Sequence, residues 1–254
     1  MFDSHCHLDF EALAPRLQEH LGEARRAGVS AWFVPGVTSR TWRGLKDVEG
    51  LSPSHIFIGV GQHPYWSSEI QNIEEFSQEL RSASRNLGAV AIGECGLDKK
   101  RGGELEHQIG LFEAHLAVAR ELQLPLVIHQ VGAREEMMKS IKRVGLPDAR
   151  GIVHGFSGDE NWGRALTSRG FKLGIGPAVT KTHRKRLRET VVALELDDFV
   201  LETDAPDQSV RSGDLVGRPI DLVAVCQEIA QLRQCDEEQV GACCSSTARR
   251  IFGV

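Results

Sequence analysis

The sequence predicts a (β/α)8 barrel, also called a TIM barrel, that forms one domain over residues 1–254. Short apolar runs bounded by glycine and proline alternate with longer segments that have the period of an amphipathic helix. No linker rich in proline, glycine or serine interrupts this alternation, and barrels of about 250 residues commonly form a single unit. An open, doubly wound sheet is the alternative, but no G-x-G-x-x-G sequence follows an early strand.

Eight apolar runs are the candidate strands, and their β-branched residues favour strands over short pieces of helix. The runs are MFDSH at the start of the chain, AWFV at 31–34, IFIGV at 56–60, AVAIG at 89–93, PLVIH at 125–129, GIVH at 151–154, FKLGI at 171–175 and FVLET at 199–203.

Helices are expected between these runs, including 12–27, 105–122 and 134–144. In the second of these, apolar residues recur every three or four positions, which is the spacing of one buried helical face. The C-terminal segment repeats this pattern around Cys244, so we expect this cysteine to pack in the core.

Composition indicates an ordinary globular protein, with 41% hydrophobic and 26% charged residues. The net charge of -5 argues against a protein that coats nucleic acid through bulk electrostatics. The first residues lack the features of a secretory signal, and no apolar run is long enough to span a bilayer, so a cytoplasmic protein without membrane contact is expected. The same context predicts that the six cysteines are reduced, and a monomer is the default expectation.

Polar residues follow the candidate strands at the end where barrel enzymes place their catalytic groups. His5 and His7 alternate in the first run and would project to the same face of a strand. Each polar residue alone has an ordinary explanation, such as a buried histidine satisfied by a carbonyl or an acidic helix cap. The full set at the strand ends is His5, His7, Glu94, His129, His154 and Asp204.

Four histidines and two carboxylates on one rim predict a site for divalent cations, because imidazole and carboxylate together suit such ions. If Glu94 bridges through its two oxygens, these six ligands hold two metals, with zinc, manganese and magnesium all compatible. His63 follows the third run and is a candidate for substrate binding or proton transfer. Three other histidines fall in expected helices and are assigned to packing or solvent exposure: His20, His107 and His115.

Several of these stretches together resemble the TatD-type metal-dependent hydrolases and deoxyribonucleases, a branch of the amidohydrolase-like barrels. The resemblance runs nearly end to end. Its carriers are DSHCHLD at the start, GQHP from Gly61, IGECGLD from Ile92, PLVIH from Pro125, HGFSG from His154 and LETDAP from Leu201.

The resemblance implies a two-metal site with His5, His7 and Asp204 on one ion, His129 and His154 on the other, and Glu94 between them. Glu202 would support the site from behind, or it is a simple carboxylate at a strand end. The hypothesis for the chemistry is hydrolysis by water whose pKa the metals lower to about 7. Asp204 would orient or deprotonate that water, and His63 would position the attacked group or protonate the leaving group.

Two departures from the family pattern leave the substrate open. Relatives commonly carry an arginine two residues after the fifth-strand histidine, where this chain has Val131. After IGECGLD many relatives carry aromatic residues, where this chain has Lys99, Lys100 and Arg101. Lys99 and Lys100 are candidate phosphate contacts. Three aromatic residues near the same rim are candidates for stacking on an unpaired base, with packing as the alternative: Tyr65, Trp66 and Phe156.

The leading functional hypothesis is therefore a metal-dependent deoxyribonuclease that removes nucleotides from DNA ends and prefers single strands. The rival within enzymes is hydrolysis of an ester or amide in a small molecule or an acyl-tRNA. A catalytically silent scaffold is a third hypothesis, and the complete ligand set argues against it, because a structural metal site has no need of a bridging carboxylate.

Overall fold

The computed structural model describes residues 1–52, 54–211, 213 and 216–254, and it confirms the predicted barrel. Eight parallel strands form one sheet in sequential order, and the backbone N–H of Ser4 donates to the carbonyl of Leu201 at 2.8 Å where the first strand meets the eighth. The strands are β1 (Phe2–Asp3), β2 (Ala31–Pro35), β3 (Ile56–Val60), β4 (Ala91–Asp98), β5 (Leu126–Val131), β6 (Gly151–Val153), β7 (Phe171–Ile175) and β8 (Phe199–Leu201).

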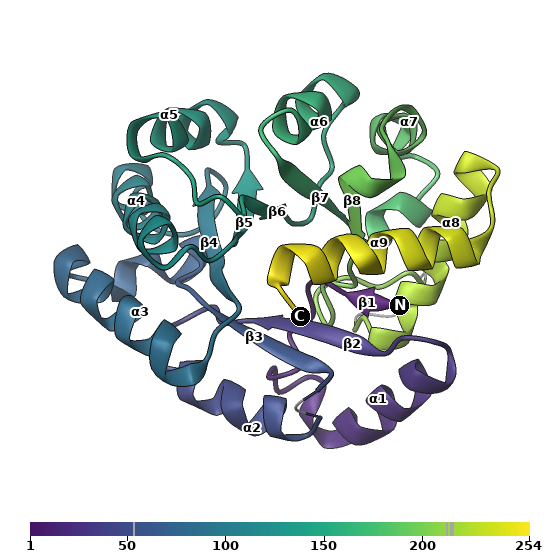
Figure 1. Ribbon diagram of the computed structural model, residues 1–254, viewed down its shortest axis with the longest axis horizontal. Coiled ribbons are helices and arrows are strands. Elements are labelled where there is room, and N and C mark those ends of the chain that lie inside the picture. The colour runs from purple at the N-terminus through teal and green to yellow at the C-terminus, as the bar shows by residue number, and fades with distance from the viewer. Residues whose placement is uncertain (53, 212, 214–215) are drawn as a thin grey trace.

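Helices surround these strands, and Figure 1 shows α9 crossing one end of the barrel close to both chain termini. The α-helices are α1 (Leu17–Arg26), α2 (Leu45–Gly50), α3 (Ile73–Leu87), α4 (Leu105–Leu122), α5 (Arg134–Val144), α6 (Glu160–Thr167), α7 (Lys185–Ala193), α8 (Leu222–Arg233) and α9 (Glu237–Phe252). Side-chain caps fix where some of them begin. Asn72 accepts hydrogen bonds from the first backbone N–H groups of α3, and Asp159 caps α6 in the same way.

The predicted bounds agree with the structure for β3, β7, α4 and α5, and differ elsewhere. The helix expected over 12–27 begins as a 3-10 turn at Ala14–Arg16, with Pro15 in its first turn, and becomes α-helical only at Leu17. The strand expected at 89–93 begins at Ala91 and continues to Asp98. The first strand is only two residues long, so His5 and His7 lie beyond its regular part.

The end of the barrel that α9 crosses is filled by an apolar cluster. Phe252 of α9 stacks on Phe33 of β2, with ring centroids 4.4 Å apart, and on Phe2 of β1 at 5.8 Å. Ala248 belongs to the same cluster, together with buried residues near the beginnings of several strands. This packing closes the amino-terminal end of the barrel. The polar residues at the carboxyl ends of the strands gather at the opposite end, because all the strands are parallel.

The expectation that Cys244 packs in the core is met. Cys244 is 1% exposed and packs in the main core, and all six cysteines are free thiols. Within the described ranges, no helix combines the length and the hydropathy that crossing a bilayer requires.

Candidate metal centre

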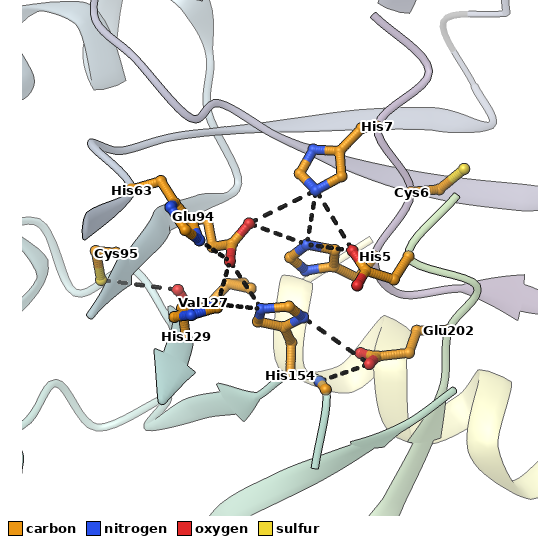
Figure 2. A network of polar contacts seen from close by, with 12 residues as sticks. His5, Cys6, His7, His63, Glu94, Cys95, Val127, His129, His154 and Glu202 are labelled. Carbon is orange, nitrogen blue, oxygen red and sulfur yellow. Dashed lines mark hydrogen bonds and ion pairs between the residues drawn. The ribbon is translucent and has the colours of Figure 1, made fainter. Parts of the chain in front are cut away.

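The six predicted ligands come together at the carboxyl end of the barrel. His5 and His7 do so from an extended segment after β1, not from a strand. This segment continues the sheet, since the N–H of Cys6 donates to Phe33 of β2 and the N–H of Asp204 donates to the carbonyl of His5. Figure 2 shows both imidazoles turned toward the centre and Cys6 turned away. The alternation that predicted a shared face for His5 and His7 is therefore preserved without a regular strand.

The first half of the centre is formed by His5, His7, Asp204 and one oxygen of Glu94. The two Nε2 atoms of His5 and His7 lie 3.3 Å apart. Oδ1 of Asp204 lies 3.7 Å from that of His5 and 3.5 Å from that of His7. Oε2 of Glu94 lies 3.1 and 3.6 Å from the same two nitrogens.

The second half uses the other oxygen of Glu94. Its Oε1 lies 2.7 Å from Nε2 of His154 and 3.1 Å from Nδ1 of His129, and these two nitrogens are 3.2 Å apart. Glu94 lies inside β4 and His129 inside β5, while His154 directly follows β6. Three neighbouring strands therefore place these three side chains on one rim.

These distances are compatible with metal coordination. Two ligand atoms each about 2.1 Å from one ion, at a tetrahedral angle, are about 3.4 Å apart, which is close to the observed spacing in both halves. Oε1 of Glu94 is buried, and no described residue makes a hydrogen bond of acceptable geometry to it, although imidazole nitrogens surround it. Close approach of nitrogens to an oxygen without hydrogen-bond geometry is the arrangement expected when these atoms are ligands of the same cation.

Charge in the centre is balanced between imidazoles and carboxylates. Burial alone would raise the pKa of Glu94, but the surrounding histidines, His154 first, lower it well below its usual range. Burial disfavours the charged form of His154, yet Glu94 raises the pKa of that imidazole to about 10. For His5 burial prevails and, with the charge of His154, lowers the pKa to about 4. The ionised carboxylate of Glu94 thus lies among imidazole nitrogens, and a metal ion that binds there has to displace the proton of His154.

Asp98, which the sequence analysis did not single out, contacts one of the candidate ligands. Its Oδ2 lies 3.0 Å from Nε2 of His129, while its Oδ1 accepts the backbone N–H groups of Lys100 and Arg101. A carboxylate on the far nitrogen of a ligating imidazole fixes its tautomer and raises its basicity. The available signal was position, because Asp98 is four residues after Glu94 in the same strand and an even spacing points to the same face.

Glu202 lies behind His154, as the sequence suggested for a supporting group. Its Oε1 accepts the backbone N–H of Gly155 at 2.6 Å and lies 3.9 Å from Nδ1 of His154, too far for a direct hydrogen bond (Figure 2). The carboxylate is fully buried, and this burial raises the pKa of Glu202 to about 8. Glu202 therefore supports the loop after β6, and its carboxylate also lies close enough to His5 and His154 to form a candidate metal-binding group with them.

His63 borders the second half of the centre. Its Nδ1 accepts the backbone N–H of Tyr65, so the neutral ring carries its proton on Nε2, which lies 3.1 Å from Oε1 of Glu94. Burial lowers the pKa of His63 and favours that neutral form. A neutral imidazole with an N–H at the edge of the centre is a donor for an oxygen atom of a bound substrate.

The candidate substrate residues differ in whether they line a cavity at the centre. Tyr65 and Trp66 line the cavity of about 90 Å³ above the centre, in which His7, His63 and Asp204 also lie. Phe156 is only 4% exposed and packs in the main core, which favours the packing alternative, although it also lines a groove beside the centre. The amine of Lys99 pairs with Glu136 at 2.8 Å, while Lys100 lines a groove beside the centre.

Comparison with known proteins identifies the family of this chain. A family model described as "TatD related DNase" matches residues 2–253. The chain belongs to the TatD family. Its TatD relatives include a "3'-5' ssDNA/RNA exonuclease TatD" of Erwinia tasmaniensis, which is 30% identical over 100% of both chains. An "uncharacterized metal-dependent hydrolase YjjV" of Escherichia coli is 28% identical over 99% of this chain and 97% of the relative.

Solved structures give the same result. The crystal structure of YjjV, a TatD homologue from Escherichia coli, superposes with a TM-score of 0.91 at 26% identity and covers 100% of this chain and 98% of that one. The family match and the clusters of histidine and carboxylate ligands agree that this TatD-family protein is a metal-dependent hydrolase.

Proposed function

We propose that this protein is a two-metal exonuclease that removes nucleotides from the ends of single-stranded nucleic acid. The observation that carries the proposal is Glu94, which divides its two oxygens between two sets of ligands. Two-metal centres stabilise the attacking and the leaving oxygen of a phosphoryl displacement. The Erwinia relative named as a 3'-5' ssDNA/RNA exonuclease supports this substrate class and the direction of digestion.

Six residues would hold the ions. His5, His7 and Asp204 would hold one, His129 and His154 would hold the other, and Glu94 would be shared by both. Bound divalent ions would supply Lewis acidity, a more acidic water and neutralisation of charge on the phosphoryl group. Zinc, manganese and magnesium remain the candidate ions, because the centre offers nitrogen and oxygen donors together.

Asp204 is assigned the proton-accepting role. Its Oδ2 accepts a hydrogen bond from Nε2 of Gln208 at 2.8 Å, which fixes the carboxylate while Oδ1 faces His5 and His7. Burial opposes ionisation, but the hydrogen bond from His7 lowers the pKa of Asp204 below its usual range. An ionised, oriented carboxylate that borders the cavity can accept a proton from the attacking water.

His63 is assigned to the leaving group. Its Nε2 proton borders the same cavity, where an alkoxide oxygen of the departing strand would carry developing charge. Tyr65 and Trp66 would contact the terminal base, since Tyr65 is only half-buried and both line this cavity. The guanidinium of Arg101 lies over the Tyr65 ring at 5.7 Å and brings a positive charge near the rim.

A second candidate is hydrolysis of a carboxylic ester or amide. The observation that favours it is Val131, which places an apolar side chain in the wall of the two cavities beside the centre. An apolar wall suits an acyl group better than a phosphate.

One experiment separates the two candidates. Single-stranded DNA and RNA labelled at the 5' end would be incubated with protein and Mg²⁺ or Mn²⁺, beside a panel of small esters and amides. The proposal predicts progressive shortening from the 3' end, release of mononucleotides and loss of both in Asp204→Asn. Intact oligonucleotides together with ester or amide turnover would reject the nuclease. An Asp204→Asn protein that holds metal and keeps the full rate would reject the base role.

A further inference from the structure

A groove leads away from the metal centre along the carboxyl ends of β5 and β6. A cavity of about 460 Å³ contains His129, His154 and Asp204 in its wall. A neighbouring cavity of about 280 Å³ shares part of that wall and ends at the side chains of α5 and α6. The residues common to both are Gln130, Val131, His154 and Gly155. The two cavities are therefore continuous at the rim.

The far end of this groove carries a tryptophan and two cations. Trp162 of α6 is half-buried, and the guanidinium of Arg134 lies 5.2 Å from the centroid of its ring. Lys100, which follows β4, also lines this cavity. Among the described residues that line it, none is an aspartate or a glutamate. In a protein with a net charge of -5, this local excess of positive charge is a departure from the average surface.

The backbone holds Trp162 in place. Its N–H donates to Oδ1 of Asp159, the capping residue of α6, at 2.9 Å. Its partly buried ring packs against the main core. The other carboxylate oxygen of Asp159 lies 3.6 Å from the Arg134 guanidinium. That guanidinium is half-exposed, and among the residues that the structure describes its contacts are this long one and the ring, so it can turn toward a phosphate.

We propose that this groove binds the part of a nucleic acid strand that follows the nucleotide being removed, with Trp162 as the surface on which an unpaired base stacks and Arg134 and Lys100 as phosphate contacts. A base on the indole takes the position of the guanidinium, which then pairs with the adjacent phosphate. Stacking on an aromatic ring does not depend on base identity, so the groove suits single strands of any sequence. The inference rests on the proposed nuclease function.

The test compares Trp162→Ala, Trp162→Phe and the control Arg164→Ala on the same helix, where the arginine is largely exposed. Each is assayed for kcat/KM on a single-stranded octanucleotide and on the small diester bis(p-nitrophenyl) phosphate. Trp162→Ala is expected to lower kcat/KM for the octanucleotide about 10-fold through KM, and to leave turnover of the small diester unchanged. Trp162→Phe should recover most of the loss, and Arg164→Ala should behave as the wild type.

A second arm places a single abasic residue at each of the four nucleotides nearest the 3' end. In the wild-type protein one of these positions is expected to raise KM about 10-fold, and in Trp162→Ala that position should have no further effect. If the wild type and Trp162→Ala digest the octanucleotide with the same KM, the stacking site is rejected while the proposed nuclease function is retained. A wild-type protein that digests no oligonucleotide at all overturns the proposed function itself.

Discussion

Oε1 of Glu94 lies 2.7 Å from Nε2 of His154, the shortest of the contacts described for the metal centre. The same carboxylate places its second oxygen 3.1 Å from Nε2 of His5, on the other side of the centre. One buried side chain thus connects residues from β4, from the segment after β1 and from the loop after β6. The stability of this end of the barrel is consequently expected to depend on the ions that the ligands bind.

Removal of the metals should lower the melting temperature. At a free ion concentration about 1,000 times the Kd, an ion that binds only the folded state stabilises it by about 4 kcal/mol, which corresponds to roughly 10 °C for a chain of this size. Scanning calorimetry of chelated and Mn²⁺-restored protein measures this difference. Glu94→Ala should gain less from Mn²⁺ than the wild type does. A wild-type protein that chelation leaves unaffected would contradict the assignment.

Asp98→Asn should weaken metal binding by about 10- to 100-fold, because the amide no longer accepts a hydrogen bond from Nε2 of His129. Asparagine keeps Oδ1, which accepts the N–H groups of Lys100 and Arg101, so the loop after β4 should stay folded. Competition with a fluorescent chelator gives the Kd, and circular dichroism checks the fold. An unchanged Kd would show that Asp98 does not orient His129.

Gly174→Ala should destabilise the barrel by about 2 kcal/mol. A Cβ at this position of β7 would overlap Oε2 of Glu202 and would push that buried carboxylate away from the N–H of Gly155. Urea denaturation measures the loss. The matched control is Gly44→Ala, whose added Cβ would meet no atom within 4 Å and whose φ is -68°. Equal stability of the two variants would mean that the site behind His154 relaxes freely.

Acid should destabilise the protein through His115, which lies away from the metal ligands. Its Nε2 accepts the backbone N–H of Gln62, and its Nδ1 donates to the carbonyl of Leu111. Burial lowers the pKa of His115 to about 4. The folded state therefore binds fewer protons than the unfolded state, whose histidine titrates near 6.5. The stabilisation is complete above about pH 6.5 and is lost as the pH falls toward 4, by an amount on the order of 3 kcal/mol.

The check for His115 is chemical denaturation of the wild type and His115→Gln between pH 7 and pH 4.5. Glutamine offers an oxygen to the Gln62 N–H but does not titrate in this range. The free energy of unfolding of the variant should fall less steeply over this interval. Parallel pH curves for the two proteins would assign the acid sensitivity to other groups.

Much of the barrel was predictable because helical and strand periodicities differ and each buried strand is bounded by turn residues. The bounds of α4 follow from apolar residues at a spacing of three and four, and those of β3 and β7 from short runs between turns. Element ends were harder to predict. The first strand ends at Asp3, since Phe2 and Asp3 are its residues that pair with β2. This pairing depends on tertiary packing and cannot be predicted from the local sequence.

The ligands were easier to find than the residues around them. Six polar residues at strand ends are conspicuous because the topology brings such ends to one rim. Asp98 looks like an ordinary residue of a strand until the side chain of His129 is placed beside it. Trp162 reads as one apolar residue of an amphipathic helix, and only the contact with Arg134 and the adjoining cavity distinguish it.

The most direct test of the central claim is the number of metal ions bound per chain, measured by mass spectrometry of elements on dialysed, Mn²⁺-loaded protein and paired with nucleotide release from single-stranded DNA. Glu94→Ala is compared with Glu79→Ala, which changes an exposed glutamate of α3. The account predicts two ions and metal-dependent release in the wild type and in Glu79→Ala, with fewer ions and a loss of more than about 100-fold in Glu94→Ala. Full activity in metal-free protein, or two ions and full activity in Glu94→Ala, would contradict it.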